Sequence, residues 1–593
     1  MRSAPLLLAI VVVGVALFCA PVHASTGMAW STFLGGGGAD NGYAVVVDAN
    51  GNIVIAGCTT STNYPTTAGS AQRTSGGGTD AVITKLTPDG ATVLWSTYLG
   101  GSGEDIARGV AVGPGGDVYV VGSTGSAAFP VTAGAWRTQF SGGASDGFVA
   151  RFSASTGALV YATYVGASWD DYPRGVAVDA SGAATVAGFT NSLDFPVTAG
   201  VVKPTRNPGL YDGADGFVTK LAANGSSAVY STYLGTNSGT DEVMALALDA
   251  NGRATVTGWT TSGGFPTTAT AYDRTLSSGH EVFVTRLNAT ASGYLFSTFL
   301  GGSASDEAYG IAVDESGATY VTGHTTSADF PTTSGAPQRT LGRAGYYDAF
   351  ASKLSADGCA LAWSTFLGGS GDEHGWSVAC YTDGQCAVAG GVNSSNFPTT
   401  AGAYRTTLAG GSDAFCTVIN ATGTALRYST YLGSGGTECS NGVAFQPSGN
   451  VVTGGATDNT NFPATVRAFD TSQNSAGLND IFVSSLDAGV AGATTAVGDP
   501  VLCGANIIVG PNPFCSRAAI RLSIAEPGRV RLRIVDVQGR VVRELADRDM
   551  SSGSCDLTWD GRDDGGRDAG AGVFFVQVAA AGGGRSHSIV RLR

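Results

Sequence analysis

One phrase recurs seven times along this chain, at intervals of 65 to 69 residues. It begins as Trp30-Ser-Thr-Phe-Leu-Gly and returns, with small variations, at Trp95, Tyr161, Tyr230, Phe296, Trp363 and Tyr428. A period of this length, filled by short β-branched and aromatic runs between Gly, Asn and Asp turns, is typical of one four-stranded propeller blade. Seven such units predict an all-β, seven-bladed β-propeller that closes into one ring.

The phase of the repeat indicates how the ring closes. In the second unit, strand patterns cover residues 109–112, 117–122, 146–152 and 161–165, which makes a four-stranded meander. The chain opens on an outer-strand phrase at Trp30 and the seventh unit ends on a third strand at residues 480–486. We therefore expect the first segment to supply the outer strand of the last blade, which removes two unpaired edges.

The N-terminus and the composition restrict location and partners. Residues 1–24 read as a secretory signal peptide, with an apolar run too short to span a bilayer and small residues at the cleavage positions. We expect no transmembrane segment and a monomeric protein that is secreted, extracellular or on the outer cell surface of a bacterium. The net charge of −14, with 36 acidic against 19 basic side chains before residue 505, argues against nucleic acid as a partner.

The repeat resembles the bacterial SBBP-type β-propeller repeat. The resemblance rests on the phrases Trp-Ser-Thr-Tyr-Leu-Gly-Gly, Gly-Val-Ala-Val and Phe-Pro-Val-Thr-Ala-Gly, and it covers about residues 28–487. It implies the fold and no single activity. We place the propeller at residues 25–488 and a small-residue linker at residues 489–504.

Residues 505–593 follow a different pattern, with about seven alternating strands in under 90 residues. This count is typical of an immunoglobulin-like β-sandwich. The phrases Pro511-Asn-Pro, Gly539-Arg-Val-Val and Trp559-Asp-Gly-Arg-Asp resemble the Ig-like domain related to flagellar hook-capping proteins and the sorting domains of type IX secretion cargo. The resemblance implies a domain for export or surface attachment that contacts the export machinery, and a spacer domain is the alternative.

Two acidic columns repeat once per unit near the predicted long-loop face. The first precedes each inner strand by four residues, and the second opens each third strand, as at Asp80 and Asp146. Such a column would bind a carbohydrate, a protein or a cation, with calcium as the conceivable cofactor. The alternative is that each carboxylate accepts hydrogen bonds from its own blade, with loop residues such as Arg73, Arg137, Arg274, Arg339 and Arg405 as ionic partners. The first column consists of Asp40, Asp105, Asp171, Asp241, Asp306, Glu373 and Glu438.

Residues that break the sevenfold symmetry are further candidates. Trp169, Trp259, His280, His324 and the run 372–376 occur in single units, and an exposed Trp beside carboxylates can stack on a sugar ring. Each can equally pack between blades. Cys380 and Cys386 flank a short turn and could form a local disulfide.

We predict no catalytic residues, because no Ser-His-Asp arrangement, zinc-ligand spacing or cofactor motif emerges. The leading hypothesis is a non-enzymatic binding or structural protein without a resident cofactor, whose acidic face binds an extracellular carbohydrate or protein. The alternative is an extracellular polysaccharide-cleaving enzyme, a lyase or hydrolase, on the long-loop face, for which the run 372–376 is the candidate site. A scaffold without a small ligand is a third possibility.

Overall fold

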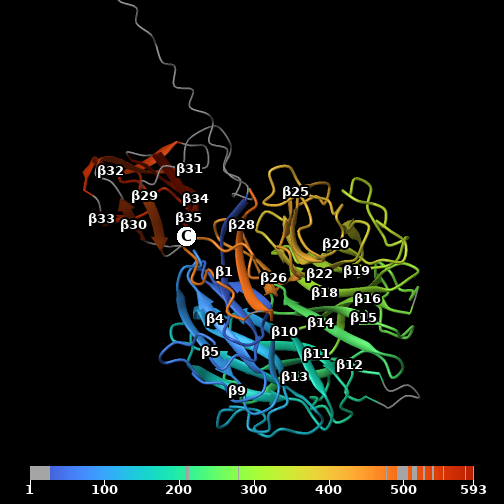
Figure 1. The fold of residues 1–593 in the computed structure, drawn as a ribbon. Coiled ribbons are helices and arrows are strands. Elements are labelled where there is room, and N and C mark those ends of the chain that lie inside the picture. Colours follow the sequence, from blue (N-terminus) through green and yellow to red (C-terminus); the bar gives the residue numbers. More distant parts are fainter. Residues whose placement is uncertain are drawn as a thin grey trace, which may run out of the picture. The chain divides into compact units, whose positions relative to one another are not determined.

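The computed structural model is built almost entirely of β-strands (Figure 1). It describes residues 27–206, 213–277, 279–475, 477–489, 505–510, 517–524, 528–536, 540–551, 553–580 and 583–591. The predicted signal peptide and most of the predicted linker lie outside these residues. The chain divides into two compact units, Met1–Ala493 and Thr494–Arg593, which are described separately below.

The first unit contains seven four-stranded antiparallel sheets, as the seven repeats predict. The inner strands are β2 (Asp40–Val47), β6 (Asp105–Val112), β10 (Asp171–Val178), β14 (Asp241–Leu248), β18 (Asp306–Val313), β22 (Glu373–Cys380) and β26 (Glu438–Phe445). The second strands are β3 (Ile53–Thr59), β7 (Val118–Thr124), β11 (Ala184–Thr190), β15 (Ala254–Thr260), β19 (Thr319–Thr325), β23 (Cys386–Val392) and β27 (Val451–Thr457).

The outer half of each blade is as regular as the inner half. The third strands are β4 (Asp80–Leu86), β8 (Asp146–Phe152), β12 (Asp215–Leu221), β16 (Glu281–Leu287), β20 (Asp348–Leu354), β24 (Asp413–Ile419) and β28 (Asp480–Asp487). The outer strands are β5 (Val93–Leu99), β9 (Leu159–Val165), β13 (Ala228–Leu234), β17 (Tyr294–Leu300), β21 (Leu361–Leu367), β25 (Leu426–Leu432) and β1 (Gly27–Leu34). One 3-10 turn, η1 (Pro114–Gly116), connects β6 and β7.

The ring closes as predicted, because β1 is the outer strand of the seventh blade. It pairs antiparallel with β28, with Trp30 opposite Ser485 and Leu34 opposite Ile481. Figure 1 shows the orange strand β28 beside the blue strand β1. The two ends of the propeller are therefore held together by one shared sheet.

Every inner strand begins at its acidic residue, four residues earlier than predicted, because each contains one β-bulge. The register of β6 against β7 shifts between Ala107 and Gly109, and the other six blades shift at the same place. A bulge leaves one residue without a ladder partner and re-aims its side chain. The bulged residues are Tyr43, Arg108, Arg174, Met244, Tyr309, Trp376 and Asn441.

The long loop after each second strand pairs with the outer strand of its own blade. In the first blade the Thr67 N–H donates to the Ser96 carbonyl at 3.1 Å, and the Tyr98 N–H donates to the Gln72 carbonyl at 3.0 Å. The loop thus runs along the free edge of the outer strand, where it satisfies backbone groups that would otherwise be unpaired. The aromatic residue before each loop proline, such as Phe129, is buried against the third strand.

In most blades the first aromatic residue of the outer strand packs on a turn of the next blade. Trp95 is buried, its Nε1–H donates to the Ala154 carbonyl at 3.1 Å, and its ring covers Gly157. Gly157 has a φ of +67°, and a Cβ added there would lie 2.5 Å from Trp95 Cε3. A larger residue at this turn therefore meets both backbone strain and a buried ring.

We expect Gly157→Ala to destabilise the propeller by about 3 kcal/mol, which combines about 1 kcal/mol for left-handed backbone with the cost of overpacking. Gly134→Ala is the matched control, because Gly134 has a φ of +80° with nothing within 4 Å of the added Cβ. Thermal unfolding of both variants separates the two costs. Equal losses in the two variants would contradict the packing role of Trp95.

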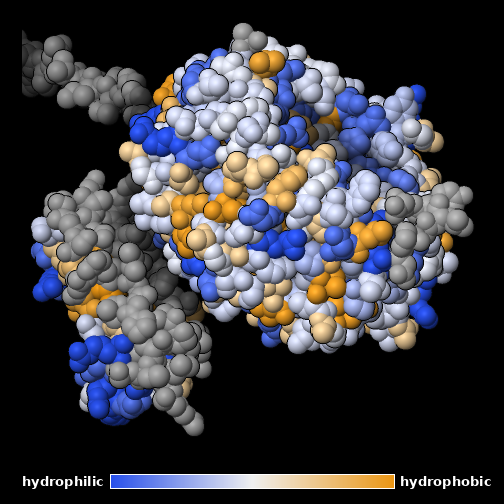
Figure 2. Space-filling view, turned by 90° about the horizontal axis from the view of Figure 1, so that it is seen from below, coloured by the Kyte–Doolittle hydropathy of each residue, from blue (hydrophilic) through white to orange (hydrophobic). Residues whose placement is uncertain are grey.

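The surface of the propeller is mixed. Figure 2 shows hydrophobic residues in small separate groups among hydrophilic ones on the face in view. Several exposed apolar side chains occupy the second position of outer strands, namely Leu94, Val160, Val229 and Leu295. Scattered apolar residues of this kind are ordinary on a soluble surface.

The second unit is a β-sandwich of two sheets, in the orders β29-β30-β33 and β32-β31-β34-β35. Trp559 lies in its core and meets the ring of Phe574 edge to face at 4.9 Å. Seven strands in two sheets agree with the Ig-like prediction. The strands are β29 (Ala505–Gly510), β30 (Ala518–Ile524), β31 (Gly528–Asp536), β32 (Val541–Met550), β33 (Gly553–Trp559), β34 (Gly572–Ala580) and β35 (Gly583–Arg591).

Candidate functional site

The predicted acidic column lies inside the blades. Asp40, Asp105, Asp171, Asp241, Asp306, Glu373 and Glu438 are all fully buried at the first position of the inner strands. Asp105 is representative, since its Oδ2 accepts hydrogen bonds from the Gly101 N–H and the Ser126 hydroxyl, both at 2.8 Å. This geometry agrees with the structural alternative, and it leaves no carboxylate of the column on the surface to contact a sugar.

Most of the loop arginines that we expected as ionic partners do not form ion pairs with the acidic columns in the described residues. Arg73, Arg274 and Arg339 are exposed. In the third unit, Asp215 instead pairs with the Lys203 Nζ at 2.5 Å, at the place where the loop sequence departs from the other units. Burial raises the pKa of most of the other acids, for example that of Asp171 to about 7. Calcium binding by these residues stays a prediction.

Three other predicted residues are placed as follows. Trp169 is 62% exposed on the loop before β10. Cys380 and Cys386 lie directly opposite each other in the β22–β23 pairing, and both are unbridged thiols in this structure.

The seven bulged residues define the centre of the ring. They line a cavity of about 470 Å³ and also a deeper one of about 240 Å³, so the bulges form a constriction between the two. Glu242, Trp259 and Glu307 complete the wall of the larger cavity. Because these three residues lie near the starts of inner strands or the end of a second strand, the larger cavity opens on the face from which the inner strands enter.

The wall from β6 and β10 is cationic. Arg108 lies over the ring of Tyr43 at 4.3 Å, and Arg174 lies over the ring of Phe189 at 5.2 Å. Neither arginine forms an ion pair with any residue that the structure describes, and the buried Arg174 Nε has no hydrogen-bond partner there. Burial, with a smaller contribution from Arg108, lowers the pKa of Arg174. Two adjacent, half-buried cations that form no ion pair are poised to receive an anion.

The opposite wall is organised around Glu307 on β18. Its Oε1 accepts from His280 Nδ1 at 2.9 Å, and its Oε2 accepts from the Tyr309 hydroxyl at 2.7 Å. Its Oε2 also lies 3.6 Å from His324 Nε2. Burial alone would raise the pKa of Glu307, but these hydrogen bonds outweigh burial and lower it to about 2. Glu307 is therefore an anion that orients three neighbours.

Glu242 on β14 has the opposite character. Burial raises its pKa to about 7, although Arg174 acts in the other direction. Trp259 stands directly opposite Glu242 in the β14–β15 register and stacks on His280, with ring centroids 4.5 Å apart at an angle of 9°. Two carboxyl groups on adjacent blades are thus tuned in opposite directions, which is typical of acid and base pairs.

The run 372–376 contributes two side chains to this wall. His374 Nδ1 lies 3.0 Å from His324 Nδ1, and the His374 ring stacks on Trp376 at 5.2 Å. Burial lowers the pKa of His374 to about 4, so the ring is neutral at pH 7. The structure therefore brings His280, His324, His374, Trp259 and Trp376 together, although sequence reasoning treated them separately.

Sequence reasoning missed Tyr43, Arg108, Arg174, Glu242 and Glu307. Their signal was present as the two positions that follow the acidic residue by one and three places, which vary among the units more than the small residue that follows them. The bulge that turns the second of these positions into the channel has no sequence signature of its own.

The repeat and the terminal domain both match known families. Residues 94–130 and 285–331 match the SBBP β-propeller repeat, and residues 516–584 match the FlgD Ig-like domain. The chain carries SBBP propeller repeats and a FlgD Ig-like domain. The first SBBP segment begins in the outer strand β5 and the second begins at the end of the third strand β16, and both end after the second strand of the following blade, so each spans the junction between two blades. No curated protein matches the sequence.

Solved structures resemble this chain only in fold. PorZ, a bacterial surface component of the type IX secretion system of Porphyromonas gingivalis, aligns at 12% identity and a TM-score of 0.35, over 92% of this chain and 59% of PorZ. A PL25 ulvan lyase aligns at 8% identity and a TM-score of 0.39, over 72% of this chain and 92% of the lyase. A fungal AA5 alcohol oxidase aligns at 14% identity and a TM-score of 0.30, over 82% and 96%. Likenesses of this size carry no argument about activity.

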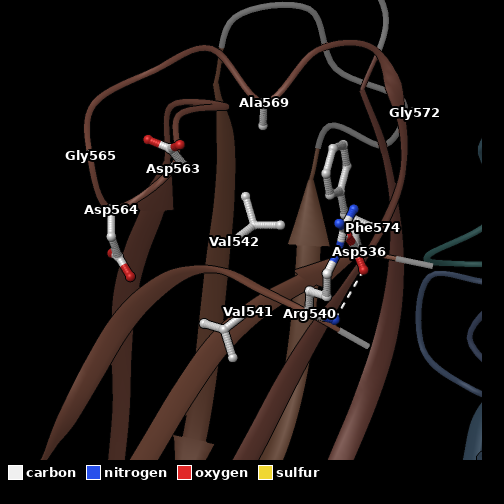
Figure 3. Close-up of a pocket in the computed structure, with 10 residues that line it drawn as sticks. All are labelled: Asp536, Arg540, Val541, Val542, Asp563, Asp564, Gly565, Ala569, Gly572 and Phe574. Carbon is white, nitrogen blue, oxygen red and sulfur yellow. Dashed lines mark hydrogen bonds and ion pairs between the residues drawn. The ribbon is translucent and has the colours of Figure 1, made fainter. Parts of the chain in front are cut away.

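Another pocket, of about 660 Å³, lies in the FlgD Ig-like domain (Figure 3). Val542 and Phe574 contribute apolar surface, and the Arg540 Nε lies 2.7 Å from the Asp536 Oδ2. Its charged groups thus have partners, and it offers no counterpart to the arginine pair of the propeller.

Two further features are absent from the residues that the structure describes. No helix there is long and apolar enough to cross a membrane. In the same part of the chain, no group of three or more His, Cys, Asp or Glu side chains is arranged to hold a metal ion.

Proposed function

We propose that this is a secreted or cell-surface protein whose propeller binds a carboxylated saccharide in its central cavity, with the FlgD Ig-like domain serving export or surface attachment. The observation that carries the proposal is the pair Arg108 and Arg174, two adjacent cations that face the cavity without an ion pair. Guanidinium groups bind carboxylates through paired, charge-assisted hydrogen bonds.

The remaining walls suit a sugar. Tyr43, Tyr309, Trp259 and Trp376 supply aromatic surface, on which sugar rings stack, and Asn441 and the carboxyl groups can bind hydroxyls. A cavity of about 470 Å³ lies within the ordinary range for small-ligand sites. The signal-like N-terminus supports an extracellular ligand.

The test is binding to an array of acidic and neutral oligosaccharides. We expect acidic members to bind and Arg108→Ala/Arg174→Ala to weaken binding at least tenfold, because a charged hydrogen bond contributes about 1.5 to 3 kcal/mol. Arg427→Ala, on the exposed part of β25, is the matched control and should bind as the unmodified protein does. Equal binding of neutral and acidic sugars, or full binding by the double variant, would sink the proposal.

A further inference from the structure

We infer that the mouth of the central cavity is a catalytic centre that cleaves uronate-containing polysaccharides by β-elimination, with His280 as the proton acceptor and Glu242 as the proton donor. The inference rests on the proposed function, because it needs a carboxylated sugar held by Arg108 and Arg174. It adds an activity to that binding site.

The arginine pair supplies the first requirement of an elimination. The proton on the carbon beside a carboxylate is weakly acidic, because its removal places further negative charge on an already anionic group. Arg108 and Arg174 line the cavity, and neither forms an ion pair with a described residue, although Glu242 lies within electrostatic range of Arg174. Fixed cations at this place stabilise the enolate-like charge as it develops.

His280 supplies the base. Glu307 is ionised and can only accept hydrogen bonds, so the 2.9 Å contact assigns the proton of His280 to Nδ1. Nε2 is then the nitrogen that exchanges a proton with a ligand. The His280 side chain is 42% exposed and stacks on Trp259, which lines the cavity, so it lies at the mouth and not in the core.

Glu242 supplies the acid. It lies on the cavity wall, within electrostatic range of Arg174, Glu307 and His280. With a pKa raised to about 7 by burial, a large fraction of its carboxyl groups carry a proton at neutral pH. Glu307, held ionised by its three neighbours, cannot serve as the donor and is a positioning residue.

The step balances without a further reactant. His280 Nε2 takes the proton from the carbon beside the carboxylate, and the electron pair of that C–H bond becomes the new C=C bond. The bond from the adjacent carbon to the glycosidic oxygen breaks, and Glu242 gives its proton to that oxygen. The chain is cut into one fragment with an unsaturated uronate and one with a new hydroxyl, and solvent returns the proton from His280 to Glu242.

The experiment incubates the full chain separately with polygalacturonate, alginate, glucuronan and chondroitin, and follows the ultraviolet absorbance of the conjugated product. We expect at least one polymer to give product. His280→Ala and Glu242→Gln should each lower kcat at least 100-fold, which is the ordinary contribution of a positioned acid or base. Glu315→Gln, on an exposed turn after β18, is the matched control for Glu242→Gln. Thermal unfolding confirms that each variant is folded.

Each outcome decides a separate point. Polymer that binds in an Arg174-dependent manner without any product overturns the elimination and leaves the proposed function standing. New reducing ends without the absorbance change show hydrolysis and also overturn it. Full activity in either His280→Ala or Glu242→Gln removes that residue's role. Neither binding nor product on any acidic polymer refutes both proposals together.

Discussion

Replacing Phe33 and Leu34 with alanine should bring the propeller close to unfolding. Both side chains are fully buried in β1, and Phe33 contacts the ring of Phe462 at a centroid distance of 6.0 Å. Truncations of buried Phe and Leu cost about 3 to 5 and 2 to 5 kcal/mol respectively. A whole domain is stable by only about 5 to 15 kcal/mol, so the double variant loses most of what holds it folded.

The control for this variant is Phe299→Ala/Leu300→Ala in β17, where the same two residue types are equally buried. In the fourth blade a turn joins the outer strand to the third strand, whereas no such turn joins β1 to β28. We expect both variants to melt earlier. Only the β1 variant should also oligomerise in size-exclusion chromatography, because its loss exposes an edge of β28. A β1 variant with the same melting temperature as the unmodified protein would contradict closure by this strand.

The propeller should be less stable at pH 8 than at pH 5. Burial raises the pKa of several acids, namely that of Asp171 and Asp348 to about 7 and that of Asp40, Asp146 and Asp306 to about 6. The folded chain holds these protons, whereas the unfolded chain releases them near 3.8. The contribution to stability is therefore complete below about pH 4 and is lost as the pH rises through 6 to 7.

Two groups act in the opposite direction. Hydrogen bonds lower the pKa of Glu307 and Asp179 to about 2, so their contribution is lost as the pH falls below 4. The melting temperature should thus pass through a maximum between about pH 4 and 6. Asp171→Asn should reduce the fall of the melting temperature between pH 6 and 8, since the shift of the Asp171 pKa from 3.8 to about 7 corresponds to about 4 kcal/mol. Asp383→Asn, on an exposed turn, is the control. A melting temperature that rises steadily to pH 8 would contradict the assignment.

The architecture was predictable because the same sequence phrase occurs seven times. The repeated phrase gave the number of blades, and the position of Trp30 in the first unit gave the closing strand. The inner strands were predicted to start four residues too late, because a bulge, as at Arg108 or Tyr309, interrupts the alternation by which strands are recognised. The pairing of the long loops with the outer strands, as at Thr67 and Gln72, was not predicted. A polar, irregular sequence does not reveal such pairing.

The candidate site was predictable only in part. His280, His324 and Trp259 were noticed because each occurs once, and His374 and Trp376 because they fall in one unusual run. Their convergence on Glu307 depends on the curvature of the ring, which brings the fourth, fifth and sixth blades to one wall. The acidic column attracted attention because it is repeated, yet repetition reflects the brace that every blade needs.

The bulges give this protein a separation between scaffold and recognition. A residue such as Arg174 has no partner in its ladder, so its exchange leaves the hydrogen bonds of the blade intact. The seven bulged positions, which surround the central cavity, can therefore be substituted without loss of the fold. Related propellers can therefore change their ligand through a few substitutions at these positions. A combinatorial library restricted to the seven bulged residues should yield mostly folded proteins.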